Sequence, residues 1–191
     1  MKYSITQISL LVAFATGLTA CGGGNDDGGG SGGGGGAVST YNGTWKGACE
    51  TVGTRSFKQT WELNGTSLKN DVKVWRTNAS CQSGTVTPVV VKADIEYKDE
   101  VSVANTCSGG KAQQVDVTYK SLKANGVTIT GEQNIQNILT SQGISNALPK
   151  YGLICKGDDG KLYRGLITAD KDASTAAKRP TEMDTTNPLV P

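Results

Sequence analysis

The sequence predicts a mainly β fold: an antiparallel up-and-down barrel, or a barrel-like sheet of about eight strands, with one short helix. Three observations predict it. Apolar and polar residues alternate along most of the body of the chain. Turn-forming pairs such as Asn-Gly separate the alternating stretches. Four cysteines, an even set, lie within that body. Amphipathic strands joined by hairpins favour closure into a barrel, because closure removes exposed sheet edges.

The 191 residues divide into four expected parts. Residues 1–20 are predicted to be a signal peptide, and 21–36 a cysteine followed by a glycine-rich linker. Residues 37–170 hold the alternating pattern of the barrel, whereas 171–191 lack any periodicity and are predicted to be an irregular tail. The linker should behave as a random coil spanning roughly 20 Å, which lets the domain reorient near its attachment point.

The N-terminus has the features of an exported precursor. Lys2 precedes an apolar stretch over 5–20 that is too short and too interrupted for a membrane helix of about 20 residues. The run Leu-Thr-Ala-Cys at 18–21 resembles the lipobox of bacterial lipoprotein precursors. That resemblance implies cleavage before Cys21 and acylation of its thiol, with palmitate or a similar chain, which would hold the protein to a lipid bilayer. An ordinary secretory leader with a chance cysteine is the alternative.

The residue after the cysteine bears on location. Gly22, rather than Asp, follows Cys21. By resemblance to Gram-negative lipoproteins, this implies delivery to the outer membrane, at its periplasmic face or the cell surface.

Alternation assigns most strands and their apolar faces. Phe57, Trp61 and Leu63 share one face, and Asn64-Gly65 then supplies a hairpin turn. Late strands are expected over 151–155 and 161–168, joined by Gly157-Asp158-Asp159-Gly160. The remaining apolar stripes are Leu68, Val72 and Val74; Val89, Val91, Ala93, Ile95 and Tyr97; and Val115, Val117 and Tyr119, which a turn at Asn125-Gly126 connects to 127–130.

One segment changes its period to that of a helix. Ile135, Ile138 and Leu139 have i, i+3, i+4 spacing, Glu132 falls in the first turn, and Gly143 follows the end. These features predict two to three helical turns that lie over one mouth of the barrel.

The four cysteines that remain beside Cys21 are expected to form two structural disulfides, as even sets in exported domains do. Three connectivities are possible, and we expect the sequential pairs Cys49–Cys81 and Cys107–Cys155, which suit a meander. No C-x-x-C is present, so neither a redox centre nor a zinc ribbon is expected.

Composition excludes several function classes. The chain has 19 basic and 17 acidic residues without a basic cluster along the sequence, so nucleic acid is not an expected partner. It has no histidine, which excludes Ser-His-Asp and Cys-His catalysis and nearly all catalytic zinc sites. Asp158 and Asp159 are interpreted as turn residues rather than as a calcium site. We therefore expect no enzyme, metal or cofactor.

A short motif resembles a known family. Gly43, Thr44 and Trp45 are similar to the G-x-W opening of lipocalins and related small barrels. In lipocalins this tryptophan closes one end of the barrel beneath a basic residue of the last strand. The resemblance implies that Arg164 is that partner here, and that the barrel holds a small ligand.

Two functions are therefore considered. The first is a non-enzymatic, membrane-anchored protein that binds a small apolar ligand inside the barrel. The second is a surface or periplasmic protein–protein module, such as an inhibitor or adhesion factor. Trp75 lies in register with polar residues, either as an exposed contact for a partner or beneath a loop or the tail. The alternation predicts the ligand lining to be Phe57, Trp61, Val72, Val91, Ile95, Val117 and Tyr119.

Overall fold

The fold is described from a computed structural model, which defines residues 40–76, 80–82, 84–104, 106–141 and 149–191. The predicted signal peptide, Cys21 and the glycine-rich linker lie outside the described residues, as does Gly143.

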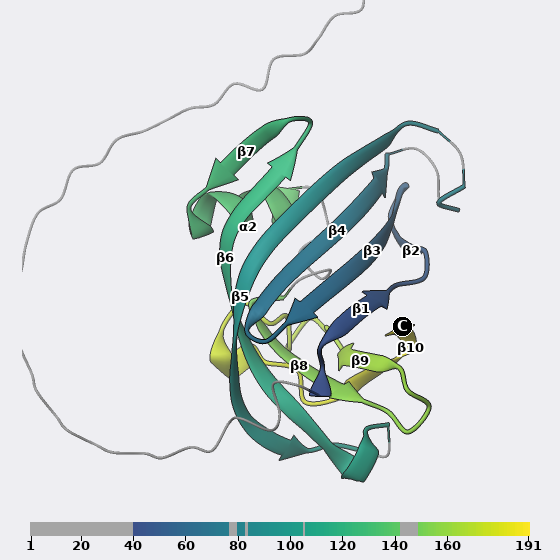
Figure 1. Cartoon of the computed structure of the whole chain (residues 1–191), viewed down its shortest axis with the longest axis vertical. Helices are drawn as coiled ribbons and strands as arrows, with labels where there is room; N and C mark the ends of the chain where they lie inside the picture. The colour runs from purple at the N-terminus through teal and green to yellow at the C-terminus, as the bar shows by residue number, and fades with distance from the viewer. Residues whose placement is uncertain (1–39, 77–79, 83, 105, 142–148) are drawn as a thin grey trace, which may run out of the picture. The chain divides into compact units, whose positions relative to one another are not determined.

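The described chain forms one mainly antiparallel sheet that curls into a nearly closed barrel (Figure 1), as the sequence predicts. Eight strands follow one another in the order β1-β3-β4-β5-β6-β8-β9-β10, while β2 pairs with β3 and β7 pairs with β6. A single α-helix, α2, is present within the described part. The elements are β1 (Gly43–Lys46), β2 (Glu50–Val52), β3 (Arg55–Asn64), β4 (Ser67–Trp75), β5 (Val86–Ser102), β6 (Lys111–Ala124), β7 (Val127–Thr130), α2 (Glu132–Ser141), β8 (Tyr151–Lys156), β9 (Leu162–Gly165) and β10 (Met183–Leu189), with 3-10 turns at Ser108–Gly110 and Ala176–Lys178.

The first and last strands meet and bring the sheet back on itself. The Lys46 amide donates to the Val190 carbonyl at 2.6 Å, and the Val190 amide donates to the Lys46 carbonyl at 2.9 Å. In Figure 1, β9 and β10 accordingly lie beside β1. This contact is short and joins the wall at β1. The neighbouring strand β2 pairs only with β3 among the described strands.

The long strand β6 divides the wall into two parts. Its residues 121–124 pair with β7, whereas residues 113–116 pair with β8 on the same side. Register shifts in the β5–β6 pair bend these long strands, as bulges commonly do. Asn125 and Gly126, at φ 50° and 81°, make the β6–β7 hairpin, and these are residue types that tolerate positive φ.

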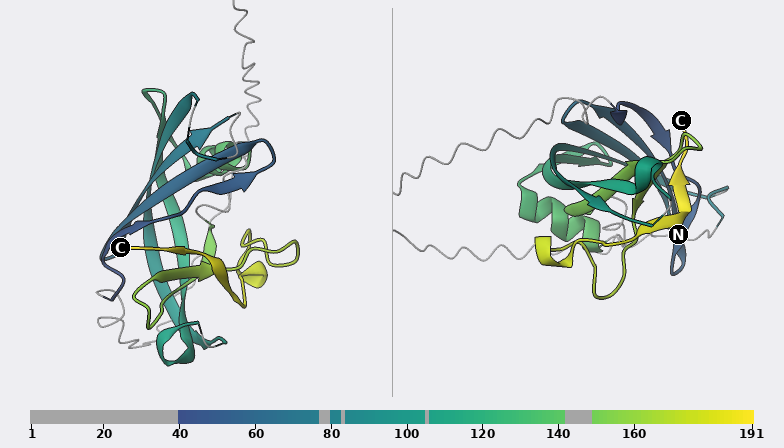
Figure 2. Two further views of the ribbon diagram at one scale, coloured as in Figure 1. Left: turned by 90° about the vertical axis from the view of Figure 1, so that its right-hand side faces the viewer. Right: turned by 90° about the horizontal axis from the view of Figure 1, so that it is seen from below.

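The helix predicted from its apolar spacing is confirmed. It packs against β6 and β7, as Figures 1 and 2 show, and buries Ile135 and Leu139 in the same core as the inward residues of the strands. Within the described part of the chain, no helix has the length and apolar character needed to cross a bilayer.

Both predicted disulfides are confirmed. Cys49 bonds to Cys81 and Cys107 bonds to Cys155, with Cα–Cα distances of 5.9 and 5.6 Å. The second bridge lies in a small apolar cluster of its own with Leu153.

The C-terminal segment corrects the prediction of an irregular tail over 171–191. β10 pairs with β9 and belongs to the barrel wall. Arg179, ahead of it, is buried and donates to the carbonyls of Val115 and Gly152 at 2.7 and 2.9 Å, and to the Asp116 carboxylate. These bonds attach the segment to β6 and β8, so tertiary contacts order a stretch that has no local periodicity.

Candidate functional site

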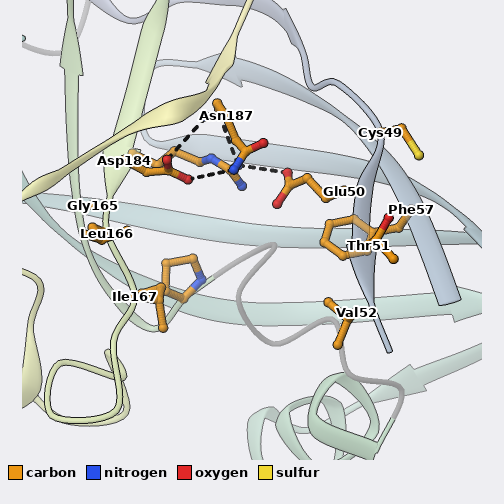
Figure 3. A pocket seen from close by; sticks show the side chains of 12 residues that line it. Cys49, Glu50, Thr51, Val52, Phe57, Gly165, Leu166, Ile167, Asp184 and Asn187 are labelled. Carbon is orange, nitrogen blue, oxygen red and sulfur yellow. Dashed lines mark hydrogen bonds and ion pairs between the residues drawn. The ribbon is translucent and has the colours of Figure 1, made fainter. Parts of the chain in front are cut away.

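A pocket of about 320 Å³ opens where the sheet is least completely closed, between β2 and the β9–β10 side (Figure 3). Its walls come from distant parts of the sequence. One wall is β2 with Phe57 of β3, and the other has residues 164–167 at the end of β9 together with Asp184 and Asn187 of β10. Cys49 and Pro149 also line the pocket. Its volume is at the lower end of the range for small-molecule sites.

The rim of this pocket is apolar on both sides. Val52 and Leu166 are 45% and 36% exposed, and they are two of the five large apolar side chains that remain exposed in the described residues. In Figure 3, Val52 and Phe57 come from one side, while Leu166 and Ile167 come from the other. An apolar molecule seated between these side chains would remove them from water, which is favourable.

The floor of the pocket carries an ion pair. The Arg164 Nη2 atom donates to Glu50 Oε1 at 2.9 Å, and the two side chains are only 7% and 18% exposed. The guanidinium carbon lies 5.9 Å from the ring centre of Trp61, a cation–π geometry. The other carboxylate oxygen, Glu50 Oε2, has no hydrogen-bond partner among the described residues.

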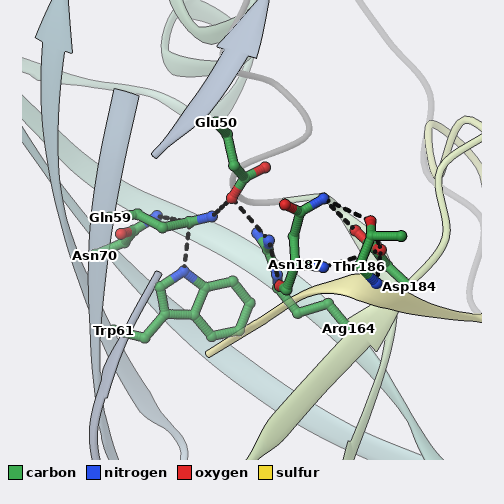
Figure 4. A network of polar contacts seen from close by, with 8 residues as sticks. All are labelled: Glu50, Gln59, Trp61, Asn70, Arg164, Asp184, Thr186 and Asn187. Carbon is green, nitrogen blue, oxygen red and sulfur yellow. Dashed lines mark hydrogen bonds and ion pairs between the residues drawn. The ribbon is translucent and has the colours of Figure 1, made fainter. Parts of the chain in front are cut away.

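Buried amides hold this ion pair in place (Figure 4). The Gln59 Nε2 atom donates to the same Glu50 oxygen at 2.8 Å. Its own Oε1 atom accepts from Trp61 Nε1 at 2.9 Å and from Asn70 Nδ2 at 3.3 Å. Glu50 is therefore connected to the barrel interior through a fixed set of hydrogen bonds, so the floor is organised before any ligand arrives.

The polar part of the lining has one net negative charge. Asp184 accepts hydrogen bonds from Thr186 and Asn187, which fold β10 locally around its carboxylate. Hydrogen bonds from these partners lower the pKa of Asp184 despite the opposing effect of burial. With Glu50 and Asp184 set against one arginine, the pocket disfavours an anionic ligand.

The interior of the barrel corrects the predicted ligand lining. All seven side chains face the interior, and each is at most 5% exposed. They therefore border almost no space that could hold a water molecule, either inside the barrel or at its surface. Of the seven, only Phe57 lines one of the pockets found in the described residues. The structure therefore moves the candidate ligand site from the barrel centre to its end. The residues packed in the core are Trp61, Val72, Val91, Ile95, Val117 and Tyr119.

Trp75 is not an exposed contact residue, because its side chain is buried at 7% exposure. Its register partner on β3 is Ser56, on the same outward face. The Cys81 amide donates to the Ser56 hydroxyl at 3.3 Å, so the disulfide-bonded segment lies against this face. This is the alternative in which a loop covers the ring.

The expected contact between Arg164 and Trp45 is also wrong. Trp45 of the Gly43–Lys46 strand lies opposite Trp61 in the β1–β3 register, and Arg164 approaches Trp61 instead. Lys156 takes the expected place, with its Nζ atom 5.9 Å from the Trp45 ring centre. Trp45 and Trp61 thus each have a basic neighbour from the β8–β9 hairpin.

The acidic turn predicted at Asp158 and Asp159 has a structural role. Asp159 accepts from the Lys161 amide and from the Tyr163 hydroxyl at 3.1 and 2.8 Å. The Lys161 ammonium and these bonds lower the pKa of Asp159 to about 2. Among the described residues, no group of three acidic or cysteine side chains is placed to hold a metal ion.

Comparison of the chain with models of protein families, with curated proteins and with solved structures finds no match in any of the three. The geometry of the pocket is therefore the basis for assigning a function.

Proposed function

We propose that this domain is a non-enzymatic binding module that holds a small, mainly apolar and uncharged ligand in the end pocket. The apolar body would lie against Val52, Phe57, Leu166 and Ile167, and a donor group of the ligand would reach Glu50 Oε2. The net negative charge of the lining argues against a carboxylate ligand.

The observation that carries this proposal is the combination of an apolar rim with a buried, pre-organised ion pair below it. Burial of such a pair is a poor source of stability, because desolvation offsets the attraction. In addition, the buried Arg164 Nε atom has no hydrogen-bond partner among the described residues, at a cost of about 1–3 kcal/mol. An arrangement that is unfavourable for folding supports a role in binding.

The rim can be tested with the uncharged fluorescent amine N-phenyl-naphthylamine, whose emission rises in apolar surroundings. It should bind the full chain, and the double variant Val52→Asp with Leu166→Asp should weaken binding by about tenfold or more, because two apolar contacts are lost. Both residues are exposed, so the melting temperature should change little.

The matched control is Val127→Asp on β7, because Val127 is 61% exposed and is not part of the pocket lining. It should bind the probe as the unmodified chain does. Equal loss of binding in the control and the rim variant, or a rim variant that binds normally, would contradict the proposed site.

We further propose that the domain is anchored to the outer membrane through an acylated Cys21, as the lipobox resemblance implies. A Cys21→Ser variant should remain unprocessed or leave the membrane fraction, because two or three acyl chains provide stable attachment. Mass analysis of the membrane-extracted protein checks this. An unmodified Cys21 thiol in the mature protein would contradict it.

A further inference from the structure

Strand register gathers lysines that are scattered along the sequence into one surface. We call this surface the lysine face. All of its members are exposed and lie on the outward side of β1 and β3 to β6, the strands that Figure 1 shows side by side. The lysine face consists of Lys46, Lys58, Lys73, Lys92 and Lys123.

The register places three of these lysines, Lys46, Lys58 and Lys73, at neighbouring positions of the sheet. Lys58 and Lys73 are direct partners in the β3–β4 pair. Lys46 is paired with Thr60, two residues along the strand from Lys58. Like charges placed directly opposite in a sheet are destabilising, so folding alone does not favour this arrangement.

Acidic neighbours do not neutralise the lysine face. Glu62 and Asp71 lie on the same outward side, but both form ion pairs with Lys69. Asp94 is paired with Lys120. None of the five lysines of the lysine face forms an ion pair with a described residue. Farther along β5 and β6, Glu96 and Asp116 lie on the same outward side and form ion pairs with Lys98. The acids on this side therefore face other lysines, and the five lysines of the lysine face are left without an acidic partner among the described residues.

We propose that the lysine face docks on the surface of a lipid bilayer that contains anionic lipid. Clustered lysines near such a surface are each attracted by the negative headgroups, and the attraction falls off within about 10 Å. A glycine-rich linker of 15 residues after Cys21 would keep the domain within reach of a bilayer. The linker keeps the domain near a bilayer only if Cys21 is anchored as proposed. Docking of the lysine face itself does not depend on the anchor or on the end pocket.

The test measures sedimentation of the full chain with vesicles, using a Cys21→Ser background so that no acyl chain contributes. Binding is expected to vesicles of phosphatidylglycerol and phosphatidylcholine at about 50 mM salt, and should fall strongly at about 500 mM salt, where screening is short-ranged. One lysine near an anionic surface contributes about fivefold in affinity. Four such contributions together correspond to about several hundredfold, so the quadruple variant should bind at least about twentyfold more weakly. It carries Lys58→Gln, Lys73→Gln, Lys92→Gln and Lys123→Gln.

The matched control removes the same number of charges from outside the lysine face. Both variants retain the leader segment, so its contribution to vesicle binding is the same in each. The control should bind within about threefold of the parent chain, because its lysines face acidic partners. It carries Lys98→Gln, Lys111→Gln, Lys161→Gln and Lys178→Gln.

Three results would overturn the proposal. The first is an equal loss of binding in both variants, which would indicate net charge alone. The second is binding to pure phosphatidylcholine that matches binding to the anionic vesicles. The third is binding of the polyanion heparin without binding of any vesicle. Circular dichroism of both variants should show an unchanged fold, because all eight lysines are at the surface.

Discussion

Replacing Arg164 with methionine should lower the free energy of unfolding by about 2–4 kcal/mol. Methionine keeps an apolar chain of similar reach against Trp61 but leaves the Glu50 carboxylate, which is 18% exposed, without its cation. The partial exposure of Glu50 places the expected loss below that of a fully buried pair. Chemical denaturation with a two-state fit measures this loss.

The matched variant is Glu50→Gln, alone and combined with Arg164→Met. Glutamine retains the size of the side chain and an acceptor for Gln59. If the ion pair is coupled as the geometry indicates, the double variant should be more stable than the sum of the two single effects predicts. Additive losses would show that Arg164 acts through packing on Trp61 alone.

Removal of the Cys107–Cys155 disulfide should lower the free energy of unfolding by about 4 kcal/mol. The bridge joins residues 48 positions apart, so its loss releases a long loop in the unfolded chain. For a domain of this size, the melting temperature should fall by about 10 °C. The double variant Cys107→Ala with Cys155→Ala, followed by calorimetry, tests this.

The Cys49–Cys81 bridge, with a separation of 32, serves as the comparison. Its removal should cost a similar amount, because loop entropy depends only weakly on length. It should also expose Trp75, whose cover includes the Cys81 segment, and so raise the quenching of tryptophan fluorescence by iodide. If removal of Cys49–Cys81 changed neither the free energy of unfolding nor the iodide quenching, the placement of this bridge over Trp75 would be contradicted.

Alternation predicted the strands and the inward side chains because a half-buried strand determines which residues face the core. Phe57 and Trp61 are inward, as expected. Alternation could not predict β10, since only the ends of Met183–Leu189 are apolar and its pairing with β9 is visible only in the fold. The polar centre of that strand is held by hydrogen bonds to Asp184, which are visible only in the fold.

The candidate site was only partly predictable for a related reason. Arg164 was identified through a motif resemblance, but the motif assigned it to the wrong tryptophan, because Trp45 and Trp61 are neighbours in the sheet. Glu50 has no local signal, and its partner lies 114 residues away. The lysine face likewise arises from register rather than from any cluster along the chain.

The most direct test of the account is to map the binding of N-phenyl-naphthylamine on the full chain by amide chemical shifts in NMR spectra. The end-pocket proposal predicts that the largest shifts fall on Val52, Phe57 and Leu166 at the rim and on Asn187. Signals from the packed centre should stay in place, because no space adjoins those side chains. Largest shifts at Val91, Ile95 and Val117 instead would show that the ligand enters the barrel interior and would contradict the end-pocket site.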